Sequence, residues 1–172
     1  MQPFYMQQAL RFSCTQCGQC CATAGEYYVY LNDEESERIR AFVHLSRGWF
    51  RRRYLQRLDG GDRVLASGPD ERCIFLDSEG SCRVYAVRPV QCRTYPFWPE
   101  LLGSAAAWNR EARRCEGINQ GRVVARSTIR RALRECIEQQ QQGNCGASLK
   151  PVAQTRRTAG RRGRVHADRD RG

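Results

Sequence analysis

The chain has 172 residues, of which 41% are hydrophobic, and a formal net charge of +11, which fits one domain with a modest core and a tail. It contains no run of 18 or more apolar residues, so we expect no membrane span. The first twelve residues lack a basic region followed by an apolar stretch and do not resemble an export signal. We therefore expect a cytoplasmic protein, in which ten cysteines indicate metal binding rather than the disulfide framework of a secreted domain.

The first elements lead into the densest group of cysteines. A short strand or an irregular lead-in is expected around Phe4, Tyr5, Leu10 and Phe12. The segment 14–21 follows, and it carries Cys14, Cys17, Cys20 and Cys21. Its C-x2-C spacing allows a tight turn to aim two sulfurs at one metal ion, and Gly18 supplies the backbone freedom. Because adjacent side chains tend to diverge, Cys20 and Cys21 are expected to serve two neighbouring metal sites. Alternatively, one of them is a redox thiol or a thiol that contacts the ligands without binding the metal.

The segment from 27 to 76 reads as alternating short strands and helices. Residues 27–31 are rich in aromatic and β-branched side chains and predict a strand. Asn32 and Glu35 form a capping pair for a helix that runs to about Ser46. A second helix is predicted from five apolar residues, namely Trp49, Phe50, Tyr54, Leu55 and Leu58. Its arginines, Arg51, Arg52, Arg53 and Arg57, are interpreted as a solvated face in preference to a phosphate-binding patch. Strands are expected at 63–67 and 73–76.

The second group of cysteines is spread over 43 residues and comprises Cys73, Cys82, Cys92 and Cys115. A turn at 77–80 delivers Cys82, and Arg88-Pro89 opens a helical turn that carries Cys92. Cys115 lies in a loop. Arginines directly adjoin all four of these cysteines, and a cationic neighbour favours the thiolate that binds metal. The aromatic stretch 97–98 either stacks on a ligand or shields the site from water, and the second is favoured.

A helix is predicted from about Gly121 to Gln142, with Cys136 as a core residue, and Cys145 is expected to be a free surface thiol. We divide the chain into a metal-binding domain at 1–145 and a disordered tail at 146–172. The tail holds Lys150 and seven arginines against two aspartates, so it carries more than half of the net charge. It could bind nucleic acid or another acidic partner through charge, although a solvated tail is the commoner case.

Eight thiols are enough for two four-ligand sites: Cys14, Cys17, Cys20, Cys21, Cys73, Cys82, Cys92 and Cys115. Soft thiolates select zinc or iron–sulfur clusters over magnesium or calcium, and all-cysteine sites suit both. The C-x2-C-x2-C run matches the first three ligands of a bacterial ferredoxin motif, but the fourth departs from it. The fold class predicted is α+β, a small domain of short strands and several helices organised by metal.

These residues resemble a known family, the YkgJ-like or CxxCxxCC cysteine-cluster family described as zinc- or iron-chelating. The resemblance covers about residues 12–118. It is carried by the eight cysteines and by the matched stretches Cys82-Arg83-Val84-Tyr85, Arg88-Pro89, Cys92-Arg93 and Tyr95-Pro96-Phe97. It implies metal binding more firmly than any reaction, because its bacterial members are mostly uncharacterised; some are labelled iron–sulfur oxidoreductases, and a related domain occurs in flagellin lysine methylases.

Three functions follow as expectations. The first is an iron–sulfur protein with a redox role, in which Cys20 or Cys21 is the candidate redox thiol if it is not a ligand. The second is a structural zinc module that binds a protein or nucleic acid. The third is a lysine methylase-like enzyme, suggested by the family resemblance alone, since the chain has no G-x-G-x-x-G loop and is short for a separate cofactor domain.

Overall fold

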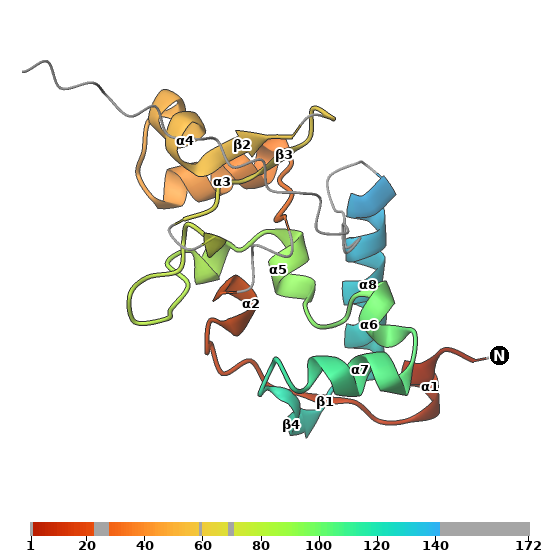
Figure 1. Ribbon diagram of the computed structural model, residues 1–172. Coiled ribbons are helices and arrows are strands. Elements are labelled where there is room, and N and C mark those ends of the chain that lie inside the picture. The colour runs from red at the N-terminus through yellow and green to blue at the C-terminus, as the bar shows by residue number, and fades with distance from the viewer. Residues whose placement is uncertain (1, 23–27, 59, 69–70, 142–172) are drawn as a thin grey trace, which may run out of the picture.

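The computed structural model describes residues 2–22, 28–58, 60–68 and 71–141. The predicted tail at 146–172 and Cys145 lie outside these residues. The fold is α+β, as predicted (Figure 1). Its elements in chain order are α1 (Phe4–Gln7), β1 (Arg11–Phe12), α2 (Gln19–Ala22), α3 (Asp33–Phe42), α4 (Arg47–Tyr54), β2 (Leu55–Arg57), β3 (Arg63–Leu65), the 3-10 turn η3 (Tyr85–Val87), α5 (Val90–Thr94), α6 (Pro99–Leu102), α7 (Ala105–Glu111), β4 (Ile118–Val123) and α8 (Arg126–Gln141).

Helix α3 begins with the predicted capping box. The Asn32 side chain accepts a hydrogen bond from the Glu35 amide at 2.8 Å, and the Glu35 carboxylate accepts one from the Asn32 amide at 3.1 Å. The helix ends at Phe42, earlier than predicted, and His44 follows with a left-handed φ of 54°. Two orphan amides at the helix start are therefore satisfied within the segment itself.

Helix α4 corrects the prediction for its apolar face. Phe50 is buried, whereas Trp49 is 58% exposed and lies outside the core. The helix stops at Tyr54, because Leu55 has an extended backbone and starts β2. Strand β2 pairs in antiparallel register with β3, with Gln56 opposite Val64.

The strands predicted at 27–31 and 73–76 are wrong as continuous strands. Tyr30 forms one isolated bridge with Val64, and Tyr27 lies outside the described residues. Cys73 forms a single bridge with Ser67 and does not continue as a strand. The strand predicted at 63–67 is present as β3 (Arg63–Leu65), and it pairs with β2. Leu76 bridges Cys82 across the predicted turn, where Asp77 Oδ1 accepts hydrogen bonds from the amides of Glu79 and Ser81.

The C-terminal helix begins later than the sequence suggested. Residues 118–123 form β4, which pairs with β1 in an irregular register, and α8 starts only at Arg126. Gly121 explains the difference, since its φ of +73° is left-handed and a Cβ there would lie 2.7 Å from the Ser13 Cβ. A left-handed residue cannot continue a right-handed helix. Within the described residues, no helix has the length and apolar character needed to cross a bilayer.

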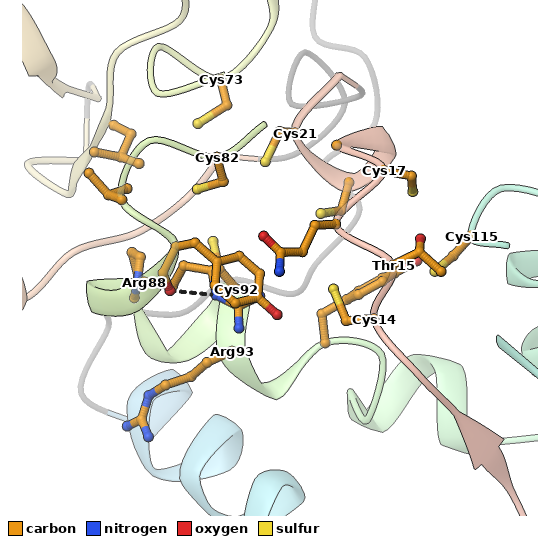
Figure 2. A pocket seen from close by; sticks show the side chains of 18 of the residues that line it. Cys14, Thr15, Cys17, Cys21, Cys73, Cys82, Arg88, Cys92, Arg93 and Cys115 are labelled. Carbon is orange, nitrogen blue, oxygen red and sulfur yellow. Dashed lines mark hydrogen bonds between the residues drawn. The ribbon is translucent and has the colours of Figure 1, made fainter. Parts of the chain in front are cut away.

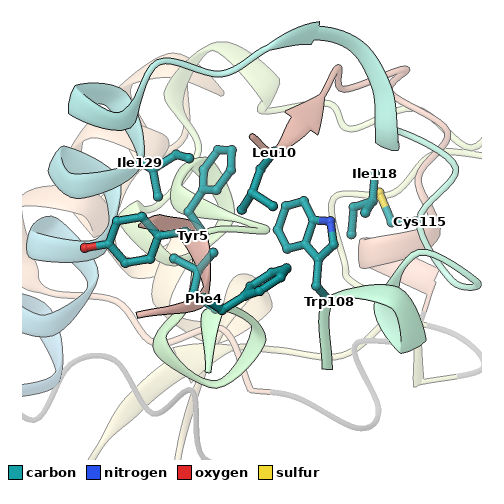
Figure 3. Packing of buried hydrophobic residues seen from close by; sticks show 9 residues of the cluster. Phe4, Tyr5, Leu10, Trp108, Cys115, Ile118 and Ile129 are labelled. Atoms are coloured by element: carbon teal, nitrogen blue, oxygen red, sulfur yellow. The ribbon is translucent and has the colours of Figure 1, made fainter. Parts of the chain in front are cut away.

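Two hydrophobic cores stabilise the chain. The first joins the N-terminal residues to residues between 97 and 129, with Phe4, Leu10, Trp108 and Ile129 among its buried members (Figure 3). The second lies within residues 31–84 and is formed by Leu31, Ile39, Phe50, Leu65, Phe75 and Val84. Helices α2 and α5 lie between the elements of the two cores (Figure 1). The intervening region holds the cysteines.

Candidate metal centre

All eight candidate cysteines line one pocket of about 100 Å³ (Figure 2). They come from five parts of the chain. Cys14 and Cys17 precede α2, Cys20 and Cys21 lie on it, and Cys92 lies on α5. Cys73 and Cys82 pack against the second core, and Cys115 belongs to the first. The pocket therefore joins the two cores.

Three of the thiols interact with the same fourth thiol, that of Cys21. The Cys21 thiol shares hydrogen bonds with the sulfurs of Cys20, Cys73 and Cys82. Its backbone supports the same meeting, because the Cys21 carbonyl accepts a hydrogen bond from the Cys73 amide at 2.9 Å. The division of Cys20 and Cys21 between sites stays a prediction: both lie on helix α2, and a hydrogen bond with Cys21 lowers the pKa of Cys20.

The remaining thiols lie around this group with other partners. Cys115 contacts the Tyr95 hydroxyl, which in turn donates a hydrogen bond to Glu111 at 2.7 Å. Cys14 contacts the hydroxyl of Tyr85. Figure 2 shows Cys14 and Cys115 on the opposite side of the pocket from Cys73 and Cys21. The eight thiols therefore form a contacting group of four and a looser group.

The protonation of the thiols differs within the pocket. The hydrogen bond from Cys21 lowers the pKa of Cys20 to about 7 and that of Cys82 to about 6. The same hydrogen bonds raise the pKa of Cys21, so this thiol keeps the shared proton. Burial raises the pKa of Cys92 and of Cys115. The lowered pKa values of Cys20, Cys73 and Cys82 thus favour the thiolate at three sulfurs, and the thiolate is the form that binds metal.

Arg88 is the cation that acts on these sulfurs. Its guanidinium lies 3.6 Å from the centre of the Tyr85 ring and donates from Nε to the Tyr85 carbonyl at 3.0 Å. Its charge contributes to the lowered pKa of both Cys20 and Cys82. Sequence adjacency pointed instead to the arginines next to cysteines, yet one of these, Arg93, forms an ion pair with Glu135 at 3.2 Å.

Two residues that position α5 were missed by the sequence analysis. Glu35 accepts a hydrogen bond from the Val90 amide at 2.7 Å, in addition to its capping bond. Gln91 accepts one from the Tyr30 amide at 3.1 Å and donates one to the Tyr28 carbonyl at 2.9 Å. Both are buried. Their hydrogen-bond partners are 55 to 63 residues away in the sequence. No local sequence pattern indicates such contacts, although a buried polar side chain is expected to have a partner.

The aromatic stretch after Cys92 does not line the pocket as predicted. Phe97 is buried in the first core, where its ring stacks on Trp108 at 6.1 Å and meets Phe12 edge-on at 5.7 Å. Trp98 donates a hydrogen bond to the Gln91 carbonyl at 3.0 Å. The aromatic residues that line the pocket are instead Phe12, Tyr85 and Tyr95.

The donor set fits zinc or iron. The residues lining the pocket supply eight thiols and two arginines, and they include no carboxylate or imidazole, which is the soft environment that both metals accept. Within the described ranges, no three Cys, His, Asp or Glu side chains already form a closed coordination shell. The described thiols therefore share a pocket without already surrounding a common point.

Replacing Gly18 by alanine is expected to disrupt the cysteine loop. Its φ is +70°, and an added Cβ would lie 2.2 Å from the Gly80 carbonyl oxygen, a backbone atom that cannot move freely. We expect a loss of about 3 kcal/mol or more in the free energy of unfolding, together with reduced metal content. The control is Gly61→Ala, because Gly61 has a φ of +86° but nothing within 4 Å of the added atom. Equal losses in the two variants, measured by urea unfolding, would show that backbone strain alone is responsible.

Alkylation of the metal-free protein should follow the thiolate population. Because the pKa of Cys82 is lowered to about 6, its rate should rise through pH 6 and reach a plateau near pH 7. Burial raises the pKa of Cys92, so this thiol should remain protonated and slow over the same range. Mass spectrometry after iodoacetamide pulses at several pH values measures both. Parallel profiles centred near pH 8.5, the ordinary thiol value, would contradict the assignment.

A comparison with protein families agrees with this site. The family model described as "CxxCxxCC: Putative zinc- or iron-chelating domain" matches residues 13–119. The match contains all eight cysteines of the pocket and leaves out the buried Cys136. No solved structure matches the chain.

Proposed function

Because the chain belongs to the CxxCxxCC family of zinc- or iron-chelating domains, we propose that its eight-thiol pocket holds an iron–sulfur cluster with a redox role. The observation that carries this proposal is one pocket of about 100 Å³ lined by all eight cysteines. About 10–15 Å³ on this measure is enough for one water molecule. The pocket thus has room for a group of several atoms, more than a single ion requires.

The residues of the pocket suit a negatively charged group. When bound, an iron–sulfur cluster supplies one-electron redox chemistry at a potential set by charge, hydrogen bonds and exposure. Arg88 places a positive charge beside Cys20 and Cys82. Apolar side chains, among them Phe12, Leu65 and Val84, line part of the same pocket.

Zinc is the second candidate, and a separate observation favours it. Cys20, Cys73 and Cys82 all contact the Cys21 sulfur, and four thiolates around zinc at about 2.3 Å also lie close to one another. In this alternative, zinc links the two cores and the chain acts as a binding module. The basic segment outside the described residues would then contact an acidic partner. No described residue adds support to a lysine methylase-like activity.

The deciding experiment is a metal and sulfide analysis of protein purified without oxygen. Iron with an equal amount of acid-labile sulfide and absorption near roughly 400 nm is expected for a cluster held by thiolates. One or two zinc ions with no sulfide would replace the first candidate by the second. Protein that is isolated with neither metal, and that takes up neither on reconstitution, would contradict both candidates.

A further inference from the structure

A second pocket, of about 500 Å³, lies between α3, α4 and the β2–β3 pair and shares no lining residue with the thiol pocket. These elements occupy the top of Figure 1. Five arginines line it, namely Arg40, Arg47, Arg51, Arg57 and Arg63. The carboxylates that line it belong to Asp33 and Glu37, so the lining carries three more positive than negative charges.

Three of the arginines are fixed by the two carboxylates. Arg40 donates two hydrogen bonds to Glu37, at 3.0 and 2.6 Å, and Arg47 approaches the other oxygen of Glu37 at 3.4 Å. Arg63 pairs with Asp33. These pairs hold the guanidinium groups in place along the wall of the pocket, which lowers the entropy that a ligand must overcome on binding.

Arg51 and Arg57 differ from these three. Their side chains form no ion pair with any residue of the described ranges. Both are exposed and line the same pocket, one from α4 and one from β2. A concave surface with uncompensated charge of one sign concentrates the opposite ion, and guanidinium groups match phosphate oxygens in a bidentate manner.

We propose that this pocket binds a small phosphate-bearing anion, either an inorganic polyphosphate or the phosphate chain of a nucleotide. Its volume falls within the range of small-molecule sites, about 300–1,000 Å³. The lining also explains why phosphate rather than a base is recognised. Its aromatic residue is Phe50, which is 2% exposed, so it offers no free ring on which the bases of a single strand could stack.

The test compares two variants of equal charge in the full-length, metal-loaded protein. Arg51→Gln with Arg57→Gln removes the two arginines of the pocket that form no ion pair within the described residues, whereas Arg52→Gln with Arg53→Gln removes two exposed cations of α4 that do not line it. Binding of tripolyphosphate and of ATP is measured by calorimetry at about 0.15 M salt, where distant surface charges are screened. Any heat from chelation of the bound metal is common to both variants.

The pocket variant should bind at least about tenfold more weakly, the effect of losing about one charged hydrogen bond, and the control should change less than about twofold. Tripolyphosphate binding alone identifies a free polyphosphate, and ATP binding as well identifies a nucleotide. The proposal is overturned if wild-type protein binds neither probe, if both variants weaken equally, or if only a thymidine oligonucleotide depends on Arg51 and Arg57. If the double variant unfolds, Arg57→Lys is measured in its place. Lysine keeps the positive charge but cannot form the two parallel hydrogen bonds of a guanidinium group, so the loss of affinity should be intermediate.

Discussion

Replacing Cys82 by serine is expected to remove most of the metal and to destabilise the protein strongly. Cys82 contacts Cys21 and has a pKa lowered to about 6, so it is a thiolate ready to bind metal at neutral pH. Loss of a residue that only hydrogen-bonds to a metal ligand already reduces metal affinity by about 10–100-fold. Loss of a ligand itself should reduce the affinity further. Metal per protein, measured by elemental analysis, reports the effect directly.

The stability loss should be large because the thiols of the pocket come from both cores, so a bound metal links them. Cys82 packs against the second core and Cys115 belongs to the first. Structural metal sites contribute on the order of 10 kcal/mol to folding, and a domain of this size has a net stability of about 5–15 kcal/mol. We therefore expect chelation of the wild type to give the same low melting temperature as Cys82→Ser.

Cys136→Ala is the matched control for that prediction. Cys136 is fully buried in α8 and lies outside the pocket, so its replacement should cost about 1 kcal/mol through packing and leave the metal content unchanged. The same metal content in Cys82→Ser as in this control would contradict a ligand role for Cys82. A loss of metal without a lower melting temperature would separate metal binding from folding.

Local rules in the sequence correctly predicted the elements that depend on neighbouring residues. The capping box of Asn32 and Glu35 and the turn at Asp77 use partners at most four residues away, so their sequence signals are complete. The family motif likewise placed all eight cysteines that line the pocket. In each case the residues that determine the structure lie within one short segment or follow a spacing that can be recognised in the sequence.

Predictions failed where a distant contact decides the structure. Trp49 and Phe50 both counted among the apolar residues that predicted the second helix, but only Phe50 is buried in the second core, whereas Trp49 is exposed. Gly121 was read as part of a helix because its strand partner, more than a hundred residues away in β1, was unknown. The contact of Cys21 with both Cys73 and Cys82 likewise depends on tertiary packing, so spacing alone could not divide the thiols between sites.

Glu35 provides the sharpest test of how the fold positions the site. Its carboxylate accepts hydrogen bonds from the amides of Asn32 and Val90, and it is 3% exposed. It therefore links the start of α3 to the start of α5, the helix that carries Cys92. Glu35→Ala leaves two amides without their partner, at about 1–3 kcal/mol for each that is buried, so the free energy of unfolding should fall by about 2–5 kcal/mol.

Glu35→Gln should lie between alanine and the wild type, because one amide oxygen replaces two carboxylate oxygens and can satisfy only one of the two amides well. Glu34→Ala is the control, since the Glu34 side chain is 88% exposed and its contact with Arg38 is 4.0 Å long; such surface pairs contribute about 0–1 kcal/mol. Urea unfolding measures the stability, and hydrogen exchange of the Val90 amide measures the local link. If Glu35→Ala lowers stability while the Val90 amide stays as protected as in the wild type, Glu35 acts on the start of α3 alone. A faster Val90 exchange together with weaker metal retention would show that this buried carboxylate positions the cysteine helix.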